Sequence, residues 1–392
     1  MAGEPATHDA SHAAAWRLGA VAPRVTRRIR RAGPAALIGL AALAPFALGP
    51  HAGVLDDMVL AAAYVVMALG LNIVVGFAGL LDLGYVAFVA IGAYTAAYFA
   101  SGFWADAGPD GQGVAILVSG PVAQLHGIHV NYLLVLALAV AATTVAGALI
   151  GVPTLRLRGD YVAIVTLAFG EIIGQVAANG GDIALFGGTL TAGPNNIGPI
   201  DRIDLPFLAP FDALDPRPWY WFALGLVVLA LVVSVRLRDS RIGRAWSALR
   251  DDEGAAAASG IPIARTKLVA YATGAAFGGV SGAFLASYFS AVNAAQFQFS
   301  FSLFIFSMVV LGGMGSIRGV VLGAIVLSTV NSYLLPDVLY SLPRRVGLDF
   351  DFSSIASGVY GAIIVFVMLM RPEGLLPPPW AAGRGRRGAS VE

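Results

Sequence analysis

The sequence contains no cysteine and only one lysine, and charged residues make up only 12% of its 392 residues. The absence of cysteine excludes disulfides and thiolate metal sites. The single lysine, Lys267, stands in ARTKL and not in a G-x-x-x-x-G-K-[ST] loop, so the chain has no P-loop for ATP. Soluble domains carry about 25% charged residues, and the scarcity of charge here therefore indicates a membrane protein.

Patterns typical of catalysis and of metal binding are also missing. No Ser-His-Asp or paired-carboxylate arrangement stands out within the apolar segments, which does not favour an integral-membrane enzyme. His126 and His129 are three residues apart, but no third metal ligand lies near them in the sequence. We therefore expect no catalytic residue, no metal site and no cofactor.

Long apolar segments make up most of the chain, of which 58% is hydrophobic. Ten segments are candidate membrane spans, although several are shorter than the roughly 20 residues of a full crossing. The sequence predicts an all-α polytopic membrane protein with about ten transmembrane helices, or eight if two segments are re-entrant. The candidate spans are residues 34–50, 58–76, 84–101, 131–151, 160–178, 219–236, 267–288, 299–313, 319–335 and 353–370.

Charge placement gives a sidedness to these segments. If the N-terminus lies inside, the predicted inner segments hold 20 of the chain's 24 lysines and arginines, while the outer loops are acidic. Only the tight turn at 77–83 lacks the expected positive charge. An even number of spans preserves this pattern, so we expect both termini to be cytoplasmic.

The same pattern predicts three regions. Residues 1–33 are a disordered basic cytoplasmic tail, 34–376 form the transmembrane domain, and 377–392 form a cytoplasmic C-terminal tail. A basic region before the short apolar stretch 34–50 also fits a cleaved signal peptide. A retained first span is the interpretation that we favour.

One charge-dense segment, residues 236–267, interrupts the apolar ones. Its arginines would each cost roughly 2.5–3.5 kcal/mol at the centre of a bilayer, so the segment must lie outside it. Ile242, Trp246 and Leu249 recur at helical spacing and give an amphipathic helix one apolar face. Asp239 or Ser240 can cap the start of this helix, and Gly260 followed by Pro262 ends it.

Two interpretations of this helix are open. A basic amphipathic helix can lie on anionic lipid headgroups. Its second half, however, carries Asp251, Asp252 and Glu253, which such a surface would repel, followed by the small residues 255–258. This change from basic to acidic and small residues favours a protein partner.

The stretch IGRAWSALRDDE (242–253), with Gly260-Ile261 and Lys267 beyond it, resembles the cytoplasmic coupling segment of branched-chain amino acid ABC-importer permeases of the LivM type. The resemblance implies that the segment contacts ATPase subunits. Ile242, Trp246 and Leu249 would be the anchors, with Arg244, Arg250 and Glu253 as rim contacts. The residues expected to couple are Arg241, Ile242, Gly243, Arg244, Trp246, Leu249, Arg250, Asp252, Glu253 and Gly260.

Two glycine-rich stretches interrupt apolar segments, NIVVGFAGLLDLG (72–84) and LGGMGSIRG (311–319). Broken backbone at membrane depth is tolerated only where protein or a water-filled cavity surrounds it. The first stretch is therefore either a discontinuous segment that lines a path, with Asp82 at its cytoplasmic edge, or an ordinary cytoplasmic turn. The following GYVAF and IGAY again resemble the LivM-type subunit.

Glu171 is the one carboxylate well inside a predicted span, and an ionisable group there indicates either a functional site or a hydrogen-bonded structural residue. The residues expected along a translocation path are Asn72, Gly76, Gly79, Asp82, Gly84, Tyr85, Glu171, Gly312, Gly313 and Gly315.

The predicted outer loop 187–200 contains TAGPNNI, which resembles the family's TGGPNGI with Ala192 and Asn196 in place of glycines. Gly193, Pro194 and Asn195 form either a lip met by a substrate-delivery protein or a simple turn-rich loop. RPEGLL (371–376) resembles the family's terminal RPQGLL.

The resemblance implies a permease subunit, not itself an enzyme, in the bacterial inner membrane. It would translocate leucine, isoleucine or valine delivered by a periplasmic binding protein. Its partners would be a related LivH-type permease and two ABC ATPase subunits that hydrolyse ATP. A permease for urea or short amides in the same family is one alternative, and a stand-alone secondary transporter or channel is another.

Overall fold

A computed structural model describes residues 39–46, 53–104, 113–118, 125–157, 159–185, 188–205, 210–212, 214–332, 361–362, 365 and 374–376. The chain divides into two units, residues 1–49 and 50–392. In the first unit, residues 39–46 are helical. The predicted tails 1–33 and 377–392 and most of the candidate span 353–370 lie outside the described residues.

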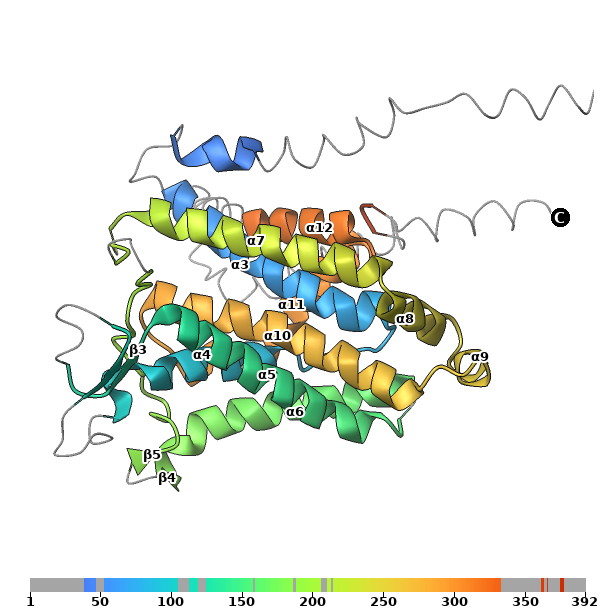
Figure 1. Ribbon diagram of the computed structural model, residues 1–392, viewed down its shortest axis with the longest axis horizontal. Coiled ribbons are helices and arrows are strands. Elements are labelled where there is room, and N and C mark those ends of the chain that lie inside the picture. Colours follow the sequence, from blue (N-terminus) through green and yellow to red (C-terminus); the bar gives the residue numbers. More distant parts are fainter. Residues whose placement is uncertain are drawn as a thin grey trace, which may run out of the picture. The chain divides into compact units, whose positions relative to one another are not determined.

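Five helices of the second unit are long and apolar enough to cross a membrane, and three shorter apolar helices run beside them (Figure 1). The long ones are α3 (Gly53–Asn72) with its π-helical continuation η1 (Ile73–Phe77), α5 (Tyr132–Thr154), α6 (Asp160–Asn179), α7 (Pro216–Asp239) and α10 (Ile263–Phe289). The short ones are α4 (Val86–Phe99), α11 (Phe299–Gly312) and α12 (Ile317–Thr329). These elements confirm a helical, multi-pass membrane protein. The number of spans and the side of the termini stay predictions.

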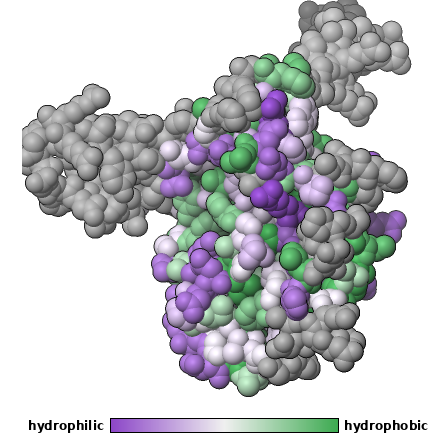
Figure 2. Space-filling model, turned by 90° about the vertical axis from the view of Figure 1, so that its left-hand side faces the viewer, coloured by the Kyte–Doolittle hydropathy of each residue, from purple (hydrophilic) through white to green (hydrophobic). Residues whose placement is uncertain are grey.

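Two small sheets, which the all-α prediction did not include, lie at one end of the helices. The first has the order β1 (Ala100–Ser101), β3 (Ile128–Val130), β2 (Val114–Ile116), and the second pairs β4 (Ala184–Leu185) with β5 (Gly188–Thr189). The short helices η2 (Gly102–Trp104) and η5 (Gly180–Asp182) adjoin them. Their ladders pair backbone groups of the connecting loops. Figure 2 shows this end face-on, with hydrophilic residues gathered among apolar ones.

The metal interpretation of the two histidines can be compared with what His129 contacts. His129 is buried, and its Nδ1 lies 2.7 Å from the Asp201 Oδ2. Burial raises the pKa of Asp201, while the hydrogen bond with His129 acts in the opposite direction. The pair joins β3 to the loop before α7, which is a structural role.

Helix α10 is the centre of the described bundle and packs against α5, α4 and α3. Glycines at four-residue spacing allow this, because they let helix backbones approach closely. A Cβ at Gly282 would overlap the Val89 carbonyl of α4, and one at Gly274 would lie 3.0 Å from the Gly70 carbonyl oxygen of α3. The core is therefore held by backbone proximity between glycine-bearing faces.

Side-chain caps fix where several helices begin. The Asn131 side chain accepts from the Leu133 amide at the start of α5, and Asp215 accepts from the Arg217 amide at the start of α7. Ser316 accepts from the Gly319 amide at the start of α12. These residues satisfy amides that have no partner within the helix.

Candidate coupling and translocation site

The charge-dense segment forms two helices at the end of the molecule opposite the strands (Figure 1): α8 (Arg241–Asp251) and α9 (Glu253–Ala258). Ser240 caps α8 by accepting from the Gly243 amide, as one of the two predicted caps. Asp252 between them is extended, and its Oδ1 accepts from the Ala255 amide at 2.9 Å. The expected single helix through 253 is therefore corrected to two, because the Asp252 side chain starts a second one. Gly260 ends the segment with φ +84°.

The apolar face of α8 packs on this chain itself. Trp246 is 0% exposed and Leu249 is 5% exposed. The Trp246 Nε1 donates to the Thr266 carbonyl at the start of α10, at 3.0 Å. Of the three expected anchors, only Ile242 is at the surface, 43% exposed. The interpretation of Trp246 and Leu249 as anchors for a partner is corrected, because α8 needs their side chains to attach to α10.

The exposed face of α8 is mixed in character and remains open to contact. It carries Arg241, Ile242, Arg244, Ser247 and Asp251. Arg244 Nη1 donates to the Asp239 carbonyl at 3.3 Å, which holds its guanidinium over the start of the helix.

The only lysine of the sequence fixes α9. The Lys267 Nζ lies 2.9 Å from the Glu253 Oε1, and the Lys267 side chain is 2% exposed. An ammonium buried to this extent needs a paired carboxylate. Glu253 therefore acts first within the chain, as the link between α9 and α10, rather than as the expected rim contact.

Arg250 also turns inward, and it joins α8 to the first glycine-rich break. Its Nη1 donates to the Gly76 carbonyl at 2.7 Å. Its aliphatic stem lies on Gly79, where an added Cβ would come 2.5 Å from the Arg250 Cγ. Gly79 has φ +72°, a conformation that also favours glycine. A side chain of the predicted coupling helix thus contacts the predicted path directly.

The two glycine-rich breaks meet in the structure. The Asn72 Oδ1 accepts from the Gly315 amide at 2.8 Å, and Asn72 is 1% exposed. Gly76 lies against both groups, and a Cβ there would overlap the Asn72 Oδ1 and the Gly315 nitrogen. Arg250, Gly76, Asn72 and Gly315 therefore form one continuous set of contacts between α8, η1 and the start of α12.

Beyond the first break the chain turns back into the helices. The Leu80 amide donates to the Val74 carbonyl at 3.1 Å, and Gly84 lies directly on the backbone of α6 at Thr166. The Ser302 hydroxyl of α11 donates to the Leu83 carbonyl at 2.6 Å. This geometry favours a discontinuous segment over an ordinary turn at the surface.

Tyr85 and Asp82 are held inside the same segment. The Tyr85 hydroxyl donates to the Gly274 carbonyl, midway along α10, at 3.0 Å. Helix α4 therefore begins partway along its neighbours instead of at their ends. Asp82 is 1% exposed, and its Oδ1 accepts from the Gly84 amide at 2.9 Å.

The second break is closed by the residues after it. Gly313 and Gly315 have φ values of +108° and +85°, and Gly312 lies against the Gly319 backbone, so α11 and α12 approach closely. The Leu375 amide donates to the Leu311 carbonyl at 2.8 Å. The end of the predicted RPEGLL motif thus packs on this break, whereas Arg371 and Glu373 lie outside the described residues.

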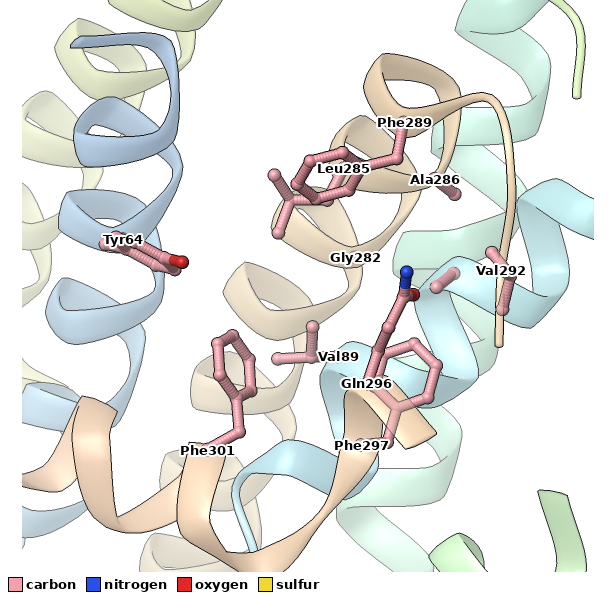
Figure 3. Close-up of a pocket in the computed structure, with 11 residues that line it drawn as sticks. Tyr64, Val89, Gly282, Leu285, Ala286, Phe289, Val292, Gln296, Phe297 and Phe301 are labelled. Atoms are coloured by element: carbon pink, nitrogen blue, oxygen red, sulfur yellow. The ribbon is translucent and has the colours of Figure 1, made fainter. Parts of the chain in front are cut away.

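A pocket of about 260 Å³ lies between α3, α4, α10, α11 and the short helix η6 (Ala294–Phe297), and Figure 3 shows its lining. Val89, Leu285 and Phe301 line it with other apolar side chains, and Tyr64 and Gln296 bring polar groups to it. The sequence analysis missed these residues. Only the fold reveals them, because they are spread over five elements and form no motif.

Comparison with known proteins identifies the family. Residues 53–368 match the family described as branched-chain amino acid transport system / permease component. The chain belongs to this family. The LivM high-affinity branched-chain amino acid transport system permease protein of Escherichia coli (strain K12) is 37% identical over 366 residues, or 87% of this chain and 74% of that protein.

Two further relatives extend this result. The probable LivM permease of Methanocaldococcus jannaschii is 27% identical, over 80% of this chain and 90% of its own length. The LivH permease of Salmonella typhimurium (strain LT2) is 28% identical over 159 residues, which is 41% of this chain and 46% of that protein. No solved structure matches. The chain is thus a branched-chain amino acid transport permease of the LivM type.

The remaining predicted residues of this permease lie outside the cluster around Arg250. Glu171 is exposed on α6. In the outer loop, the Gly193 amide donates to the Thr191 Oγ1 at 3.1 Å. The Asn293 Nδ2 donates to the Pro194 carbonyl at 3.2 Å, so the loop packs on the connection between α10 and η6. Asn195 is exposed there.

Proposed function

We propose that this LivM-type chain is the permease subunit of an ATP-driven importer in the bacterial inner membrane, and that it translocates leucine, isoleucine and valine. Two separate ATPase subunits hydrolyse ATP, since the sequence has no P-loop. The observation that carries the proposal is the contact of Arg250 with the Gly76 carbonyl. It connects a helix outside the apolar bundle to a break within it.

The proposed mechanism is alternating access. ATP binding closes the ATPase pair and displaces α8, whose exposed residues Arg241, Ile242 and Arg244 are the contact surface. Arg250 transfers that displacement to Gly76, and the Asn72–Gly315 contact passes it to α12. Helices with broken backbone can shift there without losing a full set of helical hydrogen bonds.

The proposed path follows the two breaks. It uses the backbone around Gly79, Asp82, Gly84 and Tyr85 together with Gly312 and Gly313. The apolar pocket near Gln296 offers an aliphatic side chain a favourable environment, because burial of apolar surface contributes about 25 cal/mol per Å². The loop at Gly193, Pro194 and Asn195 is the proposed lip that a periplasmic binding protein meets.

Reconstitution tests the proposal. The chain would be incorporated into proteoliposomes with a LivH-type permease, two ATPases and the binding protein. We expect uptake of labelled leucine that requires ATP inside the vesicles and stops when either ATPase is omitted. Uptake by the chain alone, driven by an ion gradient, would instead indicate a secondary transporter.

The cargo is tested separately on the binding protein. Titration with leucine, isoleucine, valine, urea and short amides should give binding with the branched-chain amino acids. Binding of urea or an amide alone would assign the transporter to that cargo.

A further inference from the structure

The exposed faces of the long helices differ in chemistry. On α5 the exposed large side chains are apolar, including Leu133, Leu138, Val145 and Leu149, as expected for a face turned to lipid. On α7 the exposed residues between its charged ends are also apolar: Trp221, Gly225, Leu229, Val232 and Val235.

Helix α6 departs from this pattern. Its exposed stripe begins with Tyr161 and Ile164 and continues with Glu171, Gln175 and Asn179, which follow one another at four-residue spacing. Residues four apart lie on one face of a helix, so the three polar side chains form a single row. This row occupies the half of the span Tyr161–Asp182 nearer to the strands.

Lipid is a poor environment for this row. Glu171 lies midway along the span, where an ionised carboxylate exposed to hydrocarbon costs several kcal/mol. Intramembrane carboxylates therefore face protein or a water-filled cavity. Among the five long helices α6 is also the least covered, with 22% of its apolar window buried against 61% for α10.

The opposite side of α6 is already in use. Gly84 packs on the α6 backbone at Thr166, and the Phe297 carbonyl oxygen would lie 3.5 Å from a Cβ at Gly174. Helix α6 thus separates the first break from whatever covers its polar row. A neighbour on the row would be one helix away from the proposed path.

We propose that the exposed stripe of α6 (Tyr161, Ile164, Glu171, Gln175 and Asn179) is the surface on which the second permease chain of the complex packs. This inference rests on the proposed function. The occupant is chosen because this chain is similar both to LivM and to LivH proteins, and LivH is itself a branched-chain permease related over 41% of this chain. A related membrane chain can offer intramembrane polar groups to pair with Glu171 and Gln175, which lipid cannot.

Site-specific photo-crosslinking in the assembled complex tests the inference. A benzophenone amino acid would be placed at Gln175 and, as a matched control, at Leu229, which is 58% exposed on the apolar face of α7. We expect the position-175 probe to give an adduct with the LivH-type chain at least tenfold more abundant than the position-229 probe. Adducts only with lipid, only with a second copy of this chain, or in equal yield from both positions would overturn the inference.

A pair of substitutions gives an independent readout. Glu171→Gln keeps a polar group in the row, whereas Glu171→Leu suits a lipid-facing surface. We expect the leucine variant to lower the co-purified LivH-type chain severalfold and the glutamine variant to retain most of it. Equal recovery in both variants would contradict the interface.

The two proposals can fail separately. A complex that crosslinks at position 175 but shows no ATP-dependent leucine uptake would contradict the proposed function and leave the interface in place. A complex that transports leucine without this adduct would do the reverse.

Discussion

Trp246 shows how burial changes the expected result of a substitution at the scale of one residue. A tryptophan in an amphipathic coupling helix would normally be tested as a partner contact. Here its side chain is fully buried and donates a hydrogen bond to the Thr266 carbonyl. Its loss should act on the attachment of α8 to α10.

We therefore expect Trp246→Ala to destabilise the chain by about 3–5 kcal/mol, the usual cost of truncating a large buried aromatic side chain. Ile242→Ala on the exposed face should leave thermal unfolding in detergent unchanged and weaken binding of the ATPase. Unfolding temperature and ATPase pull-down distinguish the two effects. A Trp246→Ala protein with normal unfolding and poor ATPase binding would show that the side chain contacts the partner instead.

Gly84 allows a second test at this scale. A Cβ there would overlap the Thr166 carbonyl, so Gly84→Ala must push the first break away from α6. We expect a loss of about 1–3 kcal/mol in stability, typical of overpacking, together with reduced leucine uptake. Gly225→Ala is the matched control, because nothing lies within 4 Å of its added Cβ. If both variants transport equally, the close approach at Gly84 has no functional weight.

At the scale of elements, Arg250 is the contact that distinguishes a coupling helix from a surface helix. A hydrogen bond from a charged donor contributes about 1.5–3 kcal/mol, and 1.4 kcal/mol corresponds to about a factor of ten. We expect Arg250→Ala to lower leucine uptake per ATP hydrolysed by about tenfold while the ATPases still bind.

Arg244→Ala is the control on the same helix. Arg244 is exposed and bonds only locally, to the Asp239 carbonyl, among the contacts that the structure describes. It should change the affinity for the ATPase and leave the ratio of uptake to hydrolysis intact. The same ratio in both variants would remove Arg250 from the coupling route.

The sequence could predict both breaks and the position of α8, because glycine clusters and apolar spacing are local signals. It could not predict that the breaks meet, since Asn72 and Gly315 are 243 residues apart. It also left open which face of α8 turns inward. An apolar stripe is required equally for packing on α10 and for docking a partner, and only the fold places Trp246 against Thr266.

At the scale of the whole molecule, composition and apolar segment length predicted the multi-pass helical class and most helix positions within a few residues. The strands β1 to β5 escaped because each has only two or three residues, too few for a period to be recognised. Sidedness rests on charge alone, and it decides whether α8 can meet an ATPase.

The absence of cysteine makes sidedness directly measurable. Single cysteines at Ser247 on α8 and Thr189 on β5 are both exposed, and α7 separates them in the chain. We expect a membrane-impermeant maleimide to label Thr189→Cys from the periplasmic side of intact spheroplasts and Ser247→Cys only in inverted vesicles. Gly254→Cys on α9 controls for protection of Ser247 by a bound ATPase, and it should follow Ser247→Cys. Labelling of both α8 and α9 positions from outside would place the arginine-rich segment in the periplasm, where no ATPase could reach it.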